Sequence, residues 1–113
     1  MSSIHSQTEN TYEDKNPNAC SVVEAVNEIG SEWRLIVLHD LVEAEEKRFN
    51  ELKRSTGASS RTLSRVLDDL ENAELVNRRV EDKPIAAFYS LTDSGMSLCP
   101  VFNELENWAD EWL

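Results

Sequence analysis

Cysteine is scarce in this chain of 113 residues, which contains only Cys20 and Cys99. The two are far apart in sequence, and neither belongs to a Cys-x-x-Cys or Cys-His cluster. This spacing argues against a disulfide framework and against a zinc site. Because His5 and His39 also have no partners at ligand spacing, we expect neither a metal nor another cofactor.

Glycine is nearly as rare, with three residues in the whole chain. The sequence has no glycine-rich phosphate loop, no Gly-x-Ser-x-Gly elbow and no visible pairing of a nucleophile with a base. We therefore expect no catalytic residues and no enzymatic activity. Long apolar runs are also absent: none approaches the ~20 residues of a membrane span, and the first residues lack the order of a signal peptide. We expect a cytoplasmic protein without a membrane partner.

Basic residues are few, with 11 against 22 acidic ones and a net charge of -11. Nucleic-acid binders are usually basic, but here residues 47–83 hold nine of the basic residues and only seven acidic ones. A basic middle within an acidic shell predicts one face that meets phosphate. The acid excess, with only four lysines, is typical of a halophile and suggests a halophilic archaeon as the source. The alternative is an acidic protein with no nucleic-acid partner.

Helical periodicity begins after a polar start. Residues 1–18 contain almost nothing to bury, so we expect a flexible tail, followed by one domain over residues 19–113. Apolar residues recur at helical spacing over residues 21–29 and again over residues 31–42. Gly30 separates these two predicted helices, and Ser31 is suited to cap the second.

Two further helices are predicted on either side of a tight turn at residues 56–58. The first is short, with Asn50 as its candidate N-cap and Gly57 closing it. The second, residues 59–73, begins at Ser59 and has apolar residues at the i, i+3, i+4 and i+7 positions. Two short helices joined in this way are typical of a helix-turn-helix, in which the second is the recognition helix.

A hairpin and a last helix follow. Residues 75–80 and 86–91 are predicted to form two short strands joined by residues 81–85, which after a helix-turn-helix make a wing. The helix predicted over residues 93–113 has no basic residue, and its apolar stripe is wider than one small domain can cover. This surplus favours a partner helix from a second copy of the chain. The expected fold class is mainly α (α+β), a winged helix-turn-helix with a two-stranded wing.

These motifs together resemble the HxlR-type regulators, distant relatives of MarR-type regulators. Residues 48–52 match the family's Arg-Phe-x-Glu-Leu, and residues 89–95 match its Tyr-Ser-Leu-Thr-x-x-Gly. Further similarity lies in the family's opening motifs, its recognition helix and the start of its wing, at residues 20–24, 29–33, 63–67 and 70–78. The resemblance implies a dimeric winged-helix transcription factor with N- and C-terminal dimerisation helices.

Cys20 is a candidate redox sensor on two grounds. It lies where the tail meets the first predicted helix, and a helix N-terminus stabilises the reactive thiolate. The resemblance also implies such a role, because some HxlR-type proteins sense oxidants or electrophiles through a cysteine at this place. The alternative is a small buried hydrophobe or an inert thiol.

Arg61 and Arg65 lie one turn apart on the polar side of the predicted recognition helix. They are candidates for contact with bases or phosphates, and the alternative is two solvated arginines paired with Asp68 or Asp69. Lys47 and Arg48 are expected to help position the DNA backbone. The full set of predicted DNA-contacting residues is Ser59, Ser60, Arg61, Thr62, Ser64, Arg65, Lys53, Arg54, Arg78 and Lys83.

The sequence thus predicts a DNA-binding transcriptional regulator that acts as a homodimer on double-stranded promoter DNA. Its effector ligand is not identified by the sequence. The predicted dimer interface consists of apolar residues of the last helix, namely Val101, Phe102, Leu105, Trp108 and Trp112. The competing hypothesis is a winged-helix module that binds only protein, in which Arg61 and Arg65 would be dispensable.

Overall fold

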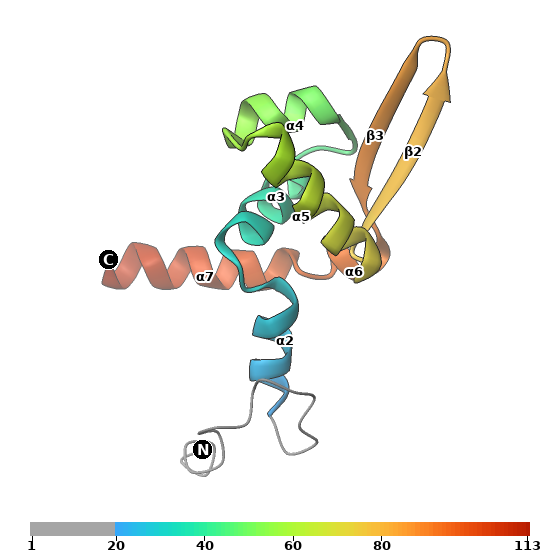
Figure 1. The fold of residues 1–113 in the computed structure, drawn as a ribbon. Helices are drawn as coiled ribbons and strands as arrows, with labels where there is room; N and C mark the ends of the chain where they lie inside the picture. The colour runs from blue at the N-terminus through green and yellow to red at the C-terminus, as the bar shows by residue number, and fades with distance from the viewer. Residues whose placement is uncertain (1–19) are drawn as a thin grey trace. The chain divides into compact units, whose positions relative to one another are not determined.

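The computed structural model describes residues 20–113, so the tail expected at residues 1–18 lies outside the described residues. The chain divides into two compact units, with the boundary after Ser31. The described part of the first unit is helix α2 (Ser21–Ile29), which follows Cys20 and ends at Gly30, as the sequence predicted. The second unit contains every other element (Figure 1).

Three helices form the core of the second unit: α3 (Glu32–Val42), α4 (Phe49–Thr56) and α5 (Ser60–Asn72). Each turns an apolar face inward, and burial of one leucine contributes about 1.5–3 kcal/mol. The largest fully buried side chains all come from these three helices: Val37, Leu38, Leu41, Leu52, Leu63, Leu67 and Leu70. The predicted helix-turn-helix is confirmed as α4 and α5.

The start of α4 differs from the prediction. Asn50 was the expected N-cap, but the helix begins at Phe49 and Arg48 occupies the cap position. The backbone N–H of Arg48 donates to the Glu51 carboxylate at 2.8 Å. This bond holds the cap residue against the first turn of α4. The Glu51 carboxylate in the first turn therefore satisfies the N–H of the cap residue, and Asn50 lies inside the helix.

The wing belongs to a sheet of three strands. Strand β2 (Val76–Asp82) and strand β3 (Ile85–Leu91) form the hairpin, and the two-residue strand β1 (Lys47–Arg48) pairs with the other edge of β3, all antiparallel. The sequence predicted only the two strands of the wing, because the two residues of β1 are too few to show a period of two. The loop expected at residues 81–85 is largely paired, which leaves Lys83 and Pro84 as the turn.

The predicted last helix is broken in two. Helix α6 (Asp93–Met96) is capped by Thr92, whose Oγ1 accepts from the Gly95 N–H at 3.0 Å, and helix α7 (Cys99–Trp112) follows. The helical residues thus begin at Asp93, where the predicted helix also begins. Pro100 lies in the first turn of α7, where its missing N–H costs no helical hydrogen bond. A single helix running through this point would have lost that bond.

Candidate nucleic-acid interface

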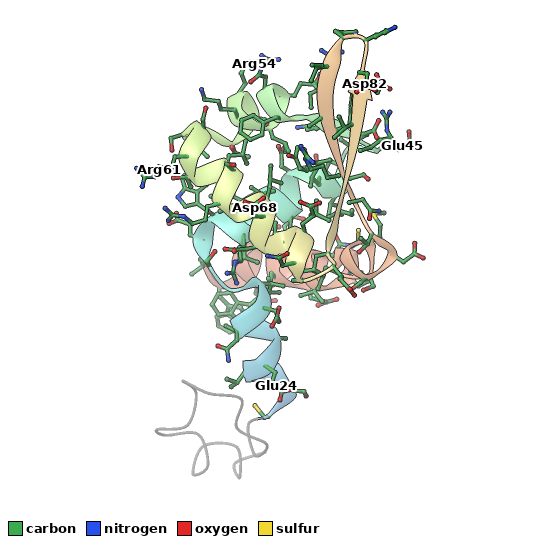
Figure 2. All side chains as sticks on the ribbon, turned by 45° about the vertical axis from the view of Figure 1, so that its right-hand side comes forward. Glu24, Glu45, Arg54, Arg61, Asp68 and Asp82 are labelled. Atoms are coloured by element: carbon green, nitrogen blue, oxygen red, sulfur yellow. The ribbon has the colours of Figure 1, made fainter. Side chains whose placement is uncertain are left out.

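Helix α5 presents a polar face because its apolar residues are spaced to bury the other one. Leu63, Val66, Leu67 and Leu70 are buried, and Arg61, Ser64 and Arg65 are exposed. The helix starts as predicted, with the Ser59 Oγ accepting from the Thr62 N–H at 3.1 Å. Figure 2 shows Arg61 extending outward from α5. The exposed face therefore carries two arginines one helical turn apart, with hydroxyls beside them.

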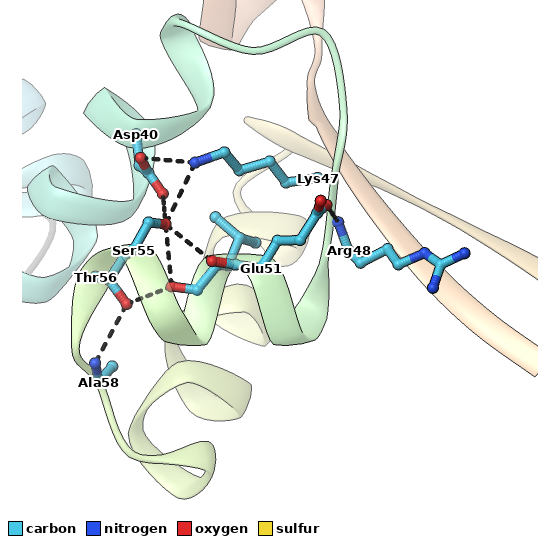
Figure 3. Close-up of polar contacts among 8 residues, drawn as sticks. Asp40, Lys47, Arg48, Glu51, Ser55, Thr56 and Ala58 are labelled. Atoms are coloured by element: carbon cyan, nitrogen blue, oxygen red, sulfur yellow. Dashed lines mark hydrogen bonds and ion pairs between the residues drawn. The ribbon is translucent and has the colours of Figure 1, made fainter.

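The turn between α4 and α5 depends on Gly57. Its φ of 79° is left-handed, and its N–H donates to the Lys53 carbonyl at 3.0 Å, which ends α4. The Thr56 hydroxyl then donates to the Leu52 carbonyl at 2.7 Å and accepts from the Ala58 N–H at 3.2 Å (Figure 3). These bonds fix the direction in which α5 leaves the turn.

Three cations of the second unit are bound by carboxylates. Arg34 pairs with Asp69 at 3.1 Å, Lys47 with Asp40 at 3.0 Å, and Arg79 with Glu46 at 2.9 Å. The remaining cations form no ion pair within residues 20–113: Arg48, Lys53, Arg54, Arg61, Arg65, Arg78 and Lys83. Apart from Arg48, which lies over the Phe88 ring, these are the cations that the sequence predicted to contact DNA. All of them are exposed, and Figure 2 shows Arg54 at the outer surface of α4.

Lys47 is placed differently from the prediction. Its Nζ contacts the Asp40 carboxylate at 3.0 Å and the Ser55 Oγ at 3.3 Å, and the Ser55 hydroxyl donates to the same carboxylate (Figure 3). Lys47 is half-buried in this cluster, which ties α3, β1 and α4 together. Its charge is neutralised inside the protein, so it is removed from the set expected to meet phosphate.

The alternative considered for Arg61 and Arg65, an ion pair with Asp69 of the same helix, is not formed. Asp69 binds Arg34 of α3, 35 residues away in sequence, and so leaves Arg61 and Arg65 without it. Spacing along one helix predicts only ion pairs within that helix. The partner of Asp69 is set instead by the packing of α3 against α5.

The predicted dimer residues do not share one environment. Val101, Leu105, Trp108 and Trp112 are exposed, with 56% of Trp108 and 67% of Trp112 accessible. Phe102 is buried within the protomer, and its ring meets the His39 ring edge-on at a centroid distance of 5.6 Å. The placement of Phe102 in the dimer interface is therefore wrong. Its position packs α7 against α3 instead.

The two cysteines are free and half-buried, and they open different helices. Cys20 occupies the N-cap position of α2, where its carbonyl accepts from the Glu24 N–H at 3.1 Å. Cys99 is the first residue of α7. Among the described residues, no group of three acidic, histidine or cysteine side chains is arranged to hold a metal ion. The same part of the chain contains no helix long and apolar enough to cross a membrane.

A helix pair with a left-handed glycine at its turn, unpaired cations on the second helix and a hairpin directly after it define a winged helix-turn-helix protein. In DNA-binding members of this class, the second helix of the pair enters the major groove. The sequence model of the HxlR-like helix-turn-helix matches residues 28–113. The chain belongs to the HxlR-like helix-turn-helix family.

Known relatives are transcriptional regulators of similar size. An HTH-type transcriptional regulator of Methanothermobacter thermautotrophicus is 40% identical over 91 residues, which cover 79% of this chain and 69% of that protein. The regulator YodB of Bacillus subtilis is 34% identical over 86 residues, 74% of this chain and 76% of YodB. The protein is thus a DNA-binding transcriptional regulator.

Solved structures agree with this fold. The reduced form of YodB from B. subtilis superposes with a TM-score of 0.73 at 33% identity, covering 82% of this chain and 93% of that one. The redox regulator HypR in its oxidised form gives a TM-score of 0.72 at 31% identity, and the match covers 81% of this chain and 96% of the HypR chain. The winged-helix architecture therefore extends over most of the residues described here.

Proposed function

We propose that this regulator binds specific sites in double-stranded promoter DNA as a cytoplasmic homodimer, with helix α5 in the major groove. The observation that carries the proposal is the division of its cations. Carboxylates neutralise Arg34, Lys47 and Arg79, whereas Arg61 and Arg65 project unpaired from α5. A cation without an internal partner is free to bind phosphate or a base edge.

The residues of this interface divide into two roles. Arg61 and Arg65 have bidentate donors that match the acceptors of guanine, so they are assigned to bases. Ser59, Ser60, Thr62 and Ser64 lie at the start of α5, where hydroxyls and free N–H groups suit a phosphate. The remaining assigned cations position the DNA backbone: Lys53, Arg54, Arg78 and Lys83.

A footprint on the promoter next to the protein's own gene tests the proposal. Arg61→Ala and Arg65→Ala should lose the footprint at concentrations where the parent protects the site. Asp68→Ala is the matched control, because Asp68 is exposed on the same helix and carries no positive charge. If both arginine variants protect DNA as well as the parent does, the assignment of Arg61 and Arg65 is wrong. If the parent itself leaves no footprint, the module that binds only protein is the better description.

The homodimer is supported by a stripe of apolar residues on α7. Val101, Leu105, Trp108 and Trp112 recur at intervals of four, three and four residues, which places them on one side of the helix, and all four are exposed. Exposed apolar stripes of this kind mark protein interfaces. Helix α2 also exposes Val22 and Val26, and we assign it a supporting role.

A second part of the proposal is a response to oxidants or electrophiles through Cys20. Two structural relatives support it: HypR is described as a redox regulator, and YodB is known in reduced and quinone-bound forms. Cys20 lies before the matched family region and opens a helix, where thiolate is favoured. Treatment with a quinone should change the footprint of the parent and of Cys99→Ser, but leave that of Cys20→Ser unchanged.

A third part concerns the medium in which the regulator works. Its net charge of -11 supports a protein adapted to concentrated salt, as in a halophilic archaeon, because surface carboxylates retain water and prevent association there. The salt dependence of folding and of DNA binding tests this part.

A further inference from the structure

The middle of the wing carries a stack of side chains centred on the Phe88 ring. In β3, Phe88 lies directly opposite Arg48 of β1 on one side and Arg79 of β2 on the other. Residues paired across neighbouring strands project from the same face of a sheet. The guanidinium carbon of Arg79 lies 4.4 Å from the ring centroid, and that of Arg48 lies 5.3 Å from it. Both distances are within the range of cation–π contact.

Two carboxylates complete the stack by binding Arg79. Glu46, the residue before β1, accepts from Arg79 Nε at 3.0 Å and from Nη2 at 2.9 Å. Glu81, two residues further along β2, accepts from Nη1. All three nitrogens of the guanidinium are therefore engaged, and the bidentate contact with Glu46 fixes its orientation. Two carboxylates also balance the two cations that flank one ring.

Arg78 offers a matched contrast one residue away. Neighbouring residues on a strand point to opposite faces, so Arg78 lies on the face of the hairpin away from the Phe88 stack. It is exposed and forms no ion pair with any residue from 20 to 113. The Arg78-Arg79 pair looks equivalent in sequence, but the structure divides it into one bound and one unbound guanidinium.

We propose that Arg79 is a positioning residue: together with Glu46, Glu81, Phe88 and Arg48 it forms a brace that holds the wing against the connection between α3 and α4. This inference rests on the proposed function, because the wing is positioned for DNA. Arg48 both pairs with β3 and caps α4, so the brace links the wing to the helix-turn-helix. Arg78 is left to meet phosphate.

The brace acts on orientation more than on folding stability. Side-chain exposure of Arg79 and Glu46 is 49% and 35%, and ion pairs at that exposure contribute little to stability. Loss of a contact between the hairpin and the segment before α4 can nevertheless change the direction in which the hairpin extends. The measurable effect should therefore appear in how the wing meets DNA.

Salt titrations of DNA binding distinguish a brace from a phosphate contact. Arg78→Gln should change the slope of log affinity against log salt by about one relative to the parent, as loss of one phosphate contact does. Arg79→Gln and Glu46→Gln should leave the slope unchanged but weaken binding a few-fold and lose protection only at the flank covered by the wing. The double variant Arg79→Gln/Glu46→Gln should bind DNA no more weakly than either single variant.

Three results would overturn the brace. Arg79→Gln shifting the slope as Arg78→Gln does would make Arg79 a phosphate contact, and tighter binding by Glu46→Gln would mean that Glu46 only restrains a DNA-binding arginine. If the parent binds no DNA, the proposed function fails while the brace is tested without DNA. Amide exchange across residues 76–91 should then be faster in Arg79→Gln and Glu46→Gln than in Arg78→Gln. Equal exchange rates in Arg79→Gln, Glu46→Gln and Arg78→Gln would be the third result that overturns the brace.

Discussion

Each cation in this chain has two competing kinds of partner, a carboxylate within the protein and a phosphate outside it. With 22 acidic residues for 11 basic ones, internal partners are plentiful, so a cation that remains unpaired is informative. Arg61 and Arg65 remain so on α5, whereas Arg34 and Arg79 do not. A guanidinium already bound in bidentate form would have to break those bonds before it could bind DNA.

Base recognition and phosphate binding are separable at single residues. Arg65→Ala should flatten base preference at one position in each half-site, because a good bidentate pair with guanine discriminates by roughly 1–3 kcal/mol. Lys53→Ala should weaken binding to all sequences alike, because a phosphate contact carries no sequence information. Binding to a set of operators with single base changes measures both effects. Identical preference profiles for the parent and both variants would contradict the assignment.

The contact between Glu46 and Arg79 predicts a dependence of stability on pH. The hydrogen bonds from Arg79 lower the pKa of Glu46 below its ordinary value of 4.5. Because this pKa is lower in the folded than in the unfolded chain, the contribution is complete above the ordinary value and is lost as pH falls through the lowered pKa. The urea midpoints of the parent and Glu46→Gln should thus differ only slightly, since exposed ion pairs contribute little to stability, and this small difference should be largest near pH 7 and vanish in acid. A difference that grows in acid would disprove the assignment.

Elements follow from local signals to different degrees. Helix α5 was predictable in full, because its cap Ser59, its glycine turn and its apolar period are all written in neighbouring residues. Strand β1 and the break between α6 and α7 were not. Two residues show no period, and β1 is a strand only because β3 pairs with it. Likewise, Lys47 and Phe102 were misjudged because their partners, Asp40 and His39, both come from another element, α3.

The short helix α6 packs closely on the residues that precede β2. A Cβ added at Gly95 would lie 2.3 Å from the Leu75 carbonyl oxygen, which is backbone and cannot turn away. Gly95→Ala should therefore destabilise the fold by about 1–3 kcal/mol, the usual effect of overpacking. Ser94→Ala, at an exposed neighbour, should stay within about 0.5 kcal/mol. Chemical unfolding compares the two, and equal stability of both variants would mean that α6 moves freely.

At the scale of the whole molecule, we expect the exposed apolar stripe of α7 to be buried in a dimer interface. Trp108→Glu places a charge in the middle of the stripe and should weaken dimerisation by about 2 kcal/mol or more, roughly thirtyfold in the dissociation constant. Asn107→Glu is the control, since it adds the same charge at an exposed position outside the stripe. Sedimentation equilibrium measures both. A stable folded monomer of the parent at micromolar concentration would refute the dimer.

The distribution of charge sets two electrostatic effects against each other when this protein meets DNA. An ordinary DNA-binding protein releases counterions, and its affinity falls with salt at a slope of about -0.9 for each phosphate neutralised. With a net charge of -11 in each chain, the proposed dimer should be repelled at long range before its cationic face can engage. The screening length falls from about 10 Å at 0.1 M salt to about 3 Å at 1 M. Concentrated salt therefore removes the repulsion while short hydrogen bonds persist.

We accordingly expect specific affinity to stay flat or to rise between low and molar potassium chloride, and the fold to be more stable at the high end. Carboxylates near the interface contribute to this, because cations taken up between them and the phosphates offset those released elsewhere. Titration of labelled operator at several salt concentrations measures the trend, and Lys53→Ala should shift its slope by about one. A steep loss of binding for the parent would show that the acidic residues lie too far from the DNA to matter. Their role would then be solubility alone.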